Sequence, residues 1–134
     1  MPFPIDIKYI NETEAKLGVK FPAAFVNKMT KLNGGSVNSP TDSWELYPFF
    51  DTSDRKRLAR TSNDIVRETM YSRKSDHFPS DGVAIGSNGC GDHLILLPQS
   101  DAPQFLSHEI YWWDHETGEV FQVADDFTDL LGDR

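Results

Sequence analysis

Cys90 and His93 are the pair of residues best suited to covalent chemistry. Nucleophilic catalysis by a thiolate needs a base within hydrogen-bond reach. The two residues stand three positions apart at the entry to the apolar run Leu94–Leu97, which is typical of a strand. Side chains three apart on a strand point to opposite faces of the sheet. We therefore predict no catalytic residue and no enzyme activity.

A phosphate-binding loop is the second chemistry that the sequence suggests, in the glycine-rich run Gly86–Gly91. Such loops surround an anion with successive backbone N–H groups and lead into the N-terminus of a helix. Here the segment that follows resembles a strand and supplies no lysine. We interpret the run as a tight hairpin turn, and no cofactor is predicted.

Four histidines and 21 acidic residues supply enough ligand types for a metal site. A zinc helix places two histidines at short spacing, as in His-Glu-x-x-His, and an EF-hand loop has its own fixed spacing of oxygen ligands. The sequence shows neither pattern, so solvated histidines are expected and no metal is predicted. The histidines are His77, His93, His108 and His115.

The net charge of −8 is distributed unevenly along the 134 residues. Residues 1–74 carry 12 basic and 9 acidic side chains, a net charge of +3, whereas residues 75–134 carry 12 acidic side chains and one basic one, Arg134, a net charge of −11. Phosphate binding depends on clustered Lys and Arg, so direct binding of nucleic acid or anionic membranes is disfavoured. The basic cluster Arg55–Arg60 is expected to be solvated or to face the acidic half. That half itself predicts a cationic partner.

Cysteine usage and length indicate the compartment and the number of domains. With Cys90 alone no intrachain disulfide can form, which fits a reducing compartment. The first residues resemble no signal peptide, and no apolar stretch is long enough to span a bilayer. We expect a cytoplasmic protein with one domain over residues 1–134. The sequence leaves homo-oligomerisation open.

Hydrophobic spacing predicts helices first and strands afterwards. Three helices are expected: from an N-cap at Asn11 to Leu17, from Pro22 to Leu32, and from a capping box at Thr61. The basic cluster Arg55–Arg60 is expected on a polar turn or a short helix. Strands with a period of two follow, and Asp125 and Asp126 are expected to cap a final short helix that ends at Leu130-Leu131. This order predicts an α+β fold, with N-terminal helices packed on one mainly antiparallel sheet and a short C-terminal helix. The expected strands are Trp44–Phe50, Gly82–Gly86, Leu94–Leu97, Glu109–Trp113 and Val120–Val123, with a surface loop over Ser72–Ser80.

The aromatic run 111–113 is the sharpest candidate for a contact with a partner. In a strand Tyr111 and Trp113 share one face and Trp112 lies on the other, so one Trp fills the core and the other lies near solvent. An exposed Trp beside carboxylates has the composition of an interaction hot spot, and packing under a helix is the alternative. The candidate partner-binding residues are Trp113, Asp114, Glu116, Asp125 and Asp126.

Motifs along nearly the whole chain also follow the order seen in a known family. They are Glu14–Pro22 with Phe25, Asn33-Gly34-Gly35, Asp81–Gly86, Gly91-Asp92, Ile110–Gly118 and Ala124–Phe127. In these motifs the chain resembles the SUKH superfamily, in its Smi/Knr branch, which is named after a yeast cell wall assembly regulator. Residues 36–80 depart most from the family pattern. The resemblance implies an α+β domain without an established catalytic centre.

The resemblance also implies a function. Bacterial members of the superfamily are chiefly known or predicted as immunity proteins that bind and neutralise toxin domains, often nucleases. A nuclease is cationic near its cleft, and an inhibitor that presents carboxylates to that cleft gains fast, steered association. We therefore expect a bacterial immunity protein whose acidic surface binds a basic toxin domain. The alternative is a regulatory scaffold domain that recruits other proteins and has no toxin partner.

Overall fold

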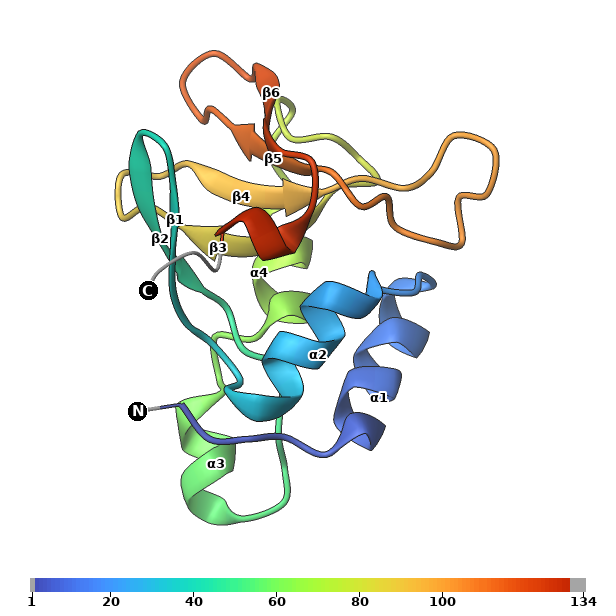
Figure 1. The fold of residues 1–134 in the computed structure, drawn as a ribbon, viewed down its shortest axis with the longest axis vertical. Coiled ribbons are helices and arrows are strands. Elements are labelled where there is room, and N and C mark those ends of the chain that lie inside the picture. Colours follow the sequence, from blue (N-terminus) through green and yellow to red (C-terminus); the bar gives the residue numbers. More distant parts are fainter. Residues whose placement is uncertain (1, 131–134) are drawn as a thin grey trace.

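The computed structural model describes residues 2–130, which form four α-helices, six strands and one 3₁₀ helix (Figure 1). The predicted α+β class is confirmed. Within these residues, no helix combines the length and the apolar character needed to cross a membrane. In chain order the elements are α1 (Ile7–Leu17), α2 (Ala23–Lys31), β1 (Gly35–Ser39), β2 (Asp42–Leu46), α3 (Arg55–Arg60), α4 (Ile65–Ser72), β3 (Val83–Ser87), β4 (His93–Leu96), β5 (Ile110–Trp113), β6 (Val120–Ala124) and the 3₁₀ helix η1 (Phe127–Leu130).

The six strands form one antiparallel sheet in chain order, from β1 at one edge to β6 at the other. The register shifts twice, because Ile85 of β3 and Val123 of β6 are the extra residues between successive pairs. A bulge bends its strand and increases the local twist. The sheet therefore curls so far that Trp44 of β2 meets Trp112 of β5 edge to face, with ring centroids 5.0 Å apart, although two strands lie between them.

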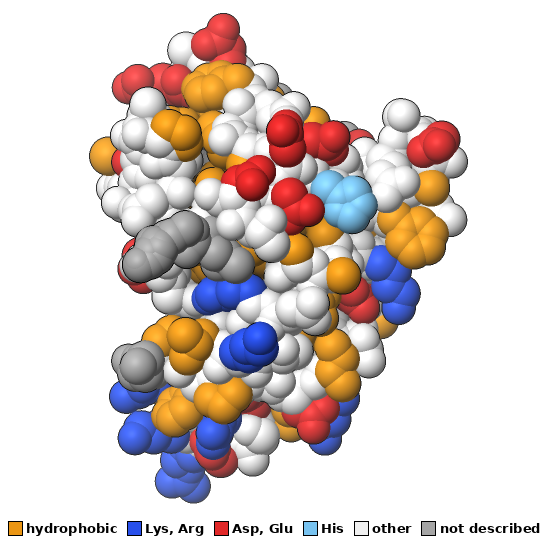
Figure 2. All heavy atoms as spheres, in the orientation of Figure 1, with side chains coloured by type: hydrophobic (Ala, Val, Ile, Leu, Met, Phe, Trp, Pro, Cys, Tyr) orange, Lys and Arg blue, Asp and Glu red, His pale blue; other side chains and the backbone are white. Residues whose placement is uncertain are grey.

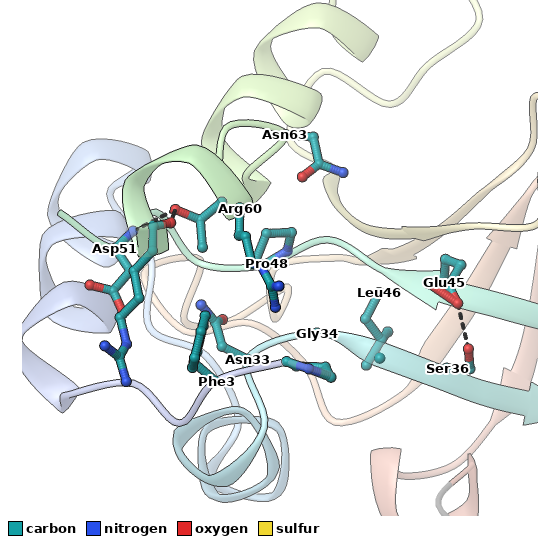
Figure 3. Close-up of a pocket in the computed structure, with 14 residues that line it drawn as sticks. Phe3, Asn33, Gly34, Ser36, Glu45, Leu46, Pro48, Asp51, Arg60 and Asn63 are labelled. Atoms are coloured by element: carbon teal, nitrogen blue, oxygen red, sulfur yellow. Dashed lines mark hydrogen bonds and ion pairs between the residues drawn. The ribbon is translucent and has the colours of Figure 1, made fainter. Parts of the chain in front are cut away.

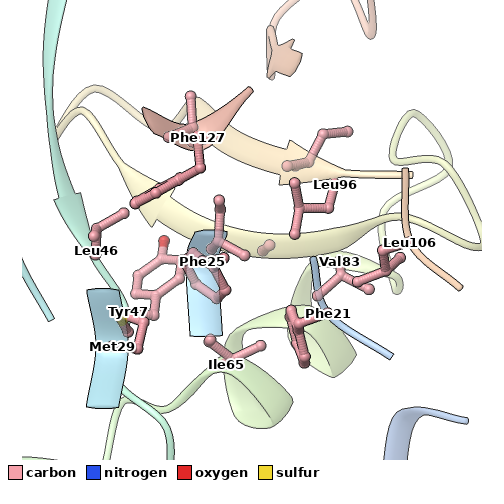
Figure 4. Packing of buried hydrophobic residues seen from close by; sticks show 14 of the residues in the cluster. Phe21, Phe25, Met29, Leu46, Tyr47, Ile65, Val83, Leu96, Leu106 and Phe127 are labelled. Carbon is pink, nitrogen blue, oxygen red and sulfur yellow. The ribbon is translucent and has the colours of Figure 1, made fainter. Parts of the chain in front are cut away.

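An aromatic cluster joins the helices to the sheet, and Phe25 of α2 lies at its centre (Figure 4). The Phe25 ring lies 5.5 Å from Phe21, 5.8 Å from Phe49 and 5.0 Å from Phe127 of η1, measured between centroids. Edge and tilted contacts of this kind stabilise a core beyond the area that they bury. The last element of the described residues is thus fixed against α2, and η1 holds the end of β6 in place.

Two predicted helix starts are wrong. Helix α1 begins one turn earlier than expected, because the Asp6 side chain caps it by accepting a hydrogen bond from the Lys8 N–H. The Glu14 carboxylate of the supposed capping box accepts instead from the Phe21 N–H, at 2.9 Å, and so ties α1 to the start of α2. Similarly, Thr61 ends α3, and the Asp64 side chain caps α4.

The strand prediction for residues 44–50 is also wrong in extent. The structure has the hairpin β1–β2 instead, and Pro48 lies beyond its end. Strand β1 has the polar sequence Gly-Ser-Val-Asn-Ser, in which Val37 and Ser39 alone are buried, so no apolar alternation marks it. At the C-terminus the expected short helix is the 3₁₀ turn η1, and Leu131 lies outside the described residues.

Candidate partner-binding surface

Charged side chains of the two signs gather at different ends of the face shown in Figure 2. On the face shown in Figure 2, Asp and Glu side chains gather over the sheet end, and Lys and Arg side chains gather over the helical end around α3. Among the described residues, Lys and Arg do not occur after Lys74. We define the acidic surface as the carboxylates along the β5–β6 hairpin and η1: Asp114, Glu116, Glu119, Asp125, Asp126 and Asp129.

Asp114 builds the turn between β5 and β6. Its Oδ1 accepts hydrogen bonds from the backbone N–H groups of Glu116, at 2.8 Å, and Thr117, at 3.3 Å. Its backbone oxygen accepts from the Gly118 N–H, and Gly118 has the positive φ of 79° that such a turn requires. Asp114 is accordingly half-buried, whereas Glu116 and Glu119 are exposed and available to a partner.

Asp125 and Asp126 follow β6 directly. The exposed Asp125 accepts a hydrogen bond from the side-chain amide of Gln122, at 2.7 Å. Asp126 is half-buried, and its Oδ1 accepts from the Thr128 N–H at the start of η1. The predicted cap is therefore present, although it caps a 3₁₀ turn. Beside these residues lies a hollow of about 380 Å³, lined by Pro40, Gln122, Val123, Ala124, Asp125, Asp129 and Leu130.

Trp113, one of the candidate partner-binding residues, is buried, with 4% of its surface exposed, so packing in the core holds for it. Its indole stacks on the His93 ring, with centroids 5.5 Å apart, and meets the edge of Phe78, while its Nε1 donates to the His77 carbonyl oxygen. Phe78 and His77 belong to the segment that was expected to be a plain surface loop. This segment covers the Trp113 face of the sheet, so Trp113 belongs to the core.

Phe121 is the aromatic residue that the sequence reasoning missed. It is 43% exposed on β6, and its ring lies 5.5 Å from that of the half-buried Trp112, its partner across β5–β6. The signal was available in principle, because a Phe opposite the other Trp of the hairpin must share its face. The surface therefore presents an aromatic pair beside the carboxylates, on the opposite face from Trp113.

Asp92 ties the β3–β4 turn to the β5–β6 turn. It is 9% exposed, and its carboxylate accepts hydrogen bonds from the His115 N–H and Nδ1, the Trp112 Nε1 and the Asn88 amide. Burial opposes ionisation of Asp92, but these hydrogen bonds hold its pKa below the usual value. The hydrogen bond to Asp92, at 2.5 Å, raises the pKa of His115. These hydrogen bonds fix the β5–β6 turn, which carries part of the acidic surface, against the β3–β4 turn.

Among the described residues, one group of side chains has the composition and spacing of a possible metal site. Ligand atoms of Asp92, Asp114 and His115 all lie within 4.8 Å of one another. The Asp92 carboxylate already accepts four hydrogen bonds, and Asp114 holds the turn through two N–H groups. These hydrogen bonds explain why the three side chains lie close together, and we assign no metal to them.

The pH dependence of stability should reveal the Asp92–His115 pair. Because the pKa of His115 is raised in the folded protein, protonated His115 stabilises the fold below about pH 6.5. This contribution to the free energy of unfolding is lost as the pH rises through the folded-state pKa. The lowered pKa of Asp92 makes it stabilising above about pH 3.9, and this contribution is lost as the pH falls through its folded-state pKa. In thermal unfolding, His115→Gln should therefore lower Tm more near pH 5 than near pH 9, about 2.5 units above the ordinary histidine pKa. The exposed His108→Gln is the control, and a pH-independent loss for His115→Gln would contradict the pairing.

His93 and Cys90 do not act as a pair. Cys90 is exposed, whereas the His93 ring nitrogens are hydrogen-bonded to the Tyr47 hydroxyl, at 2.9 Å, and the Ser72 hydroxyl, at 3.1 Å. Burial lowers the pKa of His93, and burial together with Glu68 raises the pKa of Tyr47 to about 12. Both nitrogens of this histidine are therefore used to join α4, β4 and the segment after β2.

The basic cluster Arg55–Arg60 lies on α3, at the opposite end of the molecule. None of the residues of α3 is buried, so the cluster is solvated, which was one of the two alternatives expected from the sequence. The guanidinium of Arg57 lies 4.3 Å from the centroid of the Phe3 ring and pairs with Asp54, at 2.6 Å, and with Asp51, at 3.8 Å. These acidic partners of Arg57 are local, and α3 lies at the opposite end of the molecule from the β5–β6 hairpin (Figure 1). A pocket of about 490 Å³ lies between this helix, the N-terminal segment and the start of β1 (Figure 3).

Comparison with known proteins identifies the family. The model of the SMI1 / KNR4 family (SUKH-1) matches residues 4–133, nearly the whole chain. No curated protein and no solved structure matches this sequence. The matched range includes the β5–β6 hairpin, Asp92 and the helices that support them, so the resemblance drawn from the motifs is confirmed. The chain belongs to the SMI1 / KNR4 family (SUKH-1).

Proposed function

We propose that this protein is an immunity protein that binds and neutralises a cognate toxin domain, and that the acidic surface is its docking site. The separation of charge between the two ends of the molecule carries the proposal. Exposed carboxylates flank both ends of β6, in the β5–β6 turn and directly after the strand, in a part of the chain without Lys or Arg between Lys74 and Leu130. Such a surface attracts a cationic partner and repels anionic ones.

The chemistry of nucleases suits this surface. A nuclease holds phosphate with clustered Lys and Arg, and an inhibitor that covers these groups with carboxylates blocks the substrate without any reaction of its own. Complementary charge raises the rate of association and excludes wrong partners. The fixed geometry of Asp114, which holds its own turn, supports a preformed surface that loses little conformational entropy on binding.

Family membership is consistent with an interaction domain of this type. The family consists generally of non-enzymatic immunity or regulatory domains. Neutralisation by binding needs no catalytic residue, cofactor or metal, and it predicts a stoichiometric complex in the bacterial cytoplasm. A regulatory scaffold domain is the second candidate that the family allows.

Co-expression with the product of the adjacent gene tests the proposal. We expect cells that produce both proteins to survive a toxin that kills cells producing it alone, and the two proteins to co-purify at equal stoichiometry. Toxicity that persists, together with no complex between the purified proteins, would reject the proposal. A partner search that repeatedly recovers housekeeping proteins, with no protection from any toxin, would favour the regulatory scaffold instead.

A further inference from the structure

Strand β6 forms an open edge of the sheet. Among the described residues it pairs with β5 alone. Phe121 and Gln122 are exposed, and Val120, Val123 and Ala124 are half-buried. An edge strand presents a row of backbone N–H and C=O groups that can pair with another chain. The edge is therefore a ready surface for an extended peptide segment.

The usual protections of an edge are weak here. Natural edges carry Lys, Pro or inward-pointing charges, or they contain bulges, whereas β6 has the uncharged sequence Val-Phe-Gln-Val-Ala. Its bulge lies at Val123, and the Gln122 side-chain amide donates to the Ala124 carbonyl oxygen, at 3.3 Å. Both features protect the C-terminal end of the strand, so regular pairing is open over Val120–Gln122.

Charge decides which chain fits this edge. Exposed Glu116 and Glu119 precede β6, and exposed Asp125 follows it. If two copies paired antiparallel through β6, Glu119 of one would lie near Asp125 of the other, and like charges directly across strands are destabilising. The carboxylates thus disfavour a second copy and favour a segment that carries Lys or Arg.

Phe121 adds an aromatic contact at the middle of the open stretch. Its ring packs on Trp112, with an angle of 41° between the two ring planes, and it is about half exposed. A guanidinium or ammonium group that lies over an aromatic ring is attracted by its π-system. We propose that β6 accepts an extended, Arg- or Lys-bearing segment of a partner protein as a seventh strand, with one cationic side chain over Phe121. This inference rests on the proposed function and specifies how the partner is recognised.

A synthetic peptide with alternating Arg and Val tests the strand pairing without the toxin. We expect it to shift the backbone amide resonances of Val120–Gln122 and to slow the hydrogen exchange of those N–H groups that point away from β5, since alternate N–H groups already face β5. A peptide of the same sequence, N-methylated at alternate residues, keeps the charge but loses backbone donors, and it should bind about tenfold more weakly, the equivalent of one or two hydrogen bonds. Phe121→Lys should abolish the shifts, whereas Phe105→Lys, at a residue of similar exposure (45%), should not.

Four results would overturn the inference. Equal binding of the two peptides would mean that charge alone is recognised. Changes in amide resonance confined to Glu116, Glu119 and Asp125 would mean the same. If sedimentation showed that the unmodified protein forms dimers and that Phe121→Lys does not, a second copy of this chain would be the occupant of the edge. If the toxin of the adjacent gene is neutralised but the peptide does not pair with β6, the mode of recognition is wrong while the proposed function stands.

Discussion

Replacement of Trp113 by alanine should lower the free energy of unfolding by about 3–5 kcal/mol, a large part of the roughly 5–15 kcal/mol that holds a domain folded. The variant loses the stacking on His93, the edge contact with Phe78 and the hydrogen bond to the His77 carbonyl. It also leaves a cavity beneath the segment that covers this face. Urea unfolding followed by circular dichroism measures the effect.

Two further variants separate a core residue from a contact residue. Trp113→Phe keeps an aromatic ring and should lose less stability than Trp113→Ala. Phe121→Ala removes a half-exposed ring and its cross-strand contact with Trp112, and it should lower stability by about 1 kcal/mol or less. If Trp113→Ala were as stable as the unmodified protein and lost only partner binding, Trp113 would be a surface contact and its burial here would be contradicted.

Reversal of charge on the acidic surface should have the largest effect on function. The double variant Glu116→Lys, Glu119→Lys changes two exposed residues of the β5–β6 turn that do not hold the turn through Asp114. We expect its association with the toxin domain to be about 10 to 1,000 times slower, and its protection of cells to fail at matched expression. Surface plasmon resonance and a survival assay measure the two effects.

A matched double variant controls for total charge. Glu12→Lys, Asp101→Lys makes the same change in net charge at exposed residues outside the acidic surface. It should protect cells and associate nearly as fast as the unmodified protein. Equal losses in the two double variants would show that net charge, and not the position of the carboxylates, governs binding.

The parts of the fold predicted correctly are those with a strong apolar pattern. Phe25 and Met29 mark α2 by their helical spacing, and the runs around Ile85 and Ile95 mark β3 and β4. Strand β1 was missed because its polar residues carry no such pattern. Capping residues were misplaced because Asn11 and Glu14 fit a capping box, although Glu14 is used by the Phe21 N–H.

The positions of the carboxylates in the fold could be predicted, but the burial of the aromatic residues beside them could not. The distribution of charge and the predicted hairpin together located the carboxylates on β5–β6 and after it. Which Trp is buried depends on what covers each face, and that is decided by Phe78, from a segment more than 30 residues away in the chain. The curl of the sheet has a similar origin, because the bulges at Ile85 and Val123 leave no mark in the hydrophobic pattern.

The salt dependence of association tests the central claim most directly. The rate constant for binding of the purified product of the adjacent gene should be measured from about 50 to 500 mM salt, a range over which the Debye length falls about threefold. For the unmodified protein we predict a rate that falls steeply with salt and converges at high salt on that of Glu116→Lys, Glu119→Lys. A rate that does not depend on salt, or a double variant that binds as fast as the unmodified protein at low salt, would contradict docking through the acidic surface.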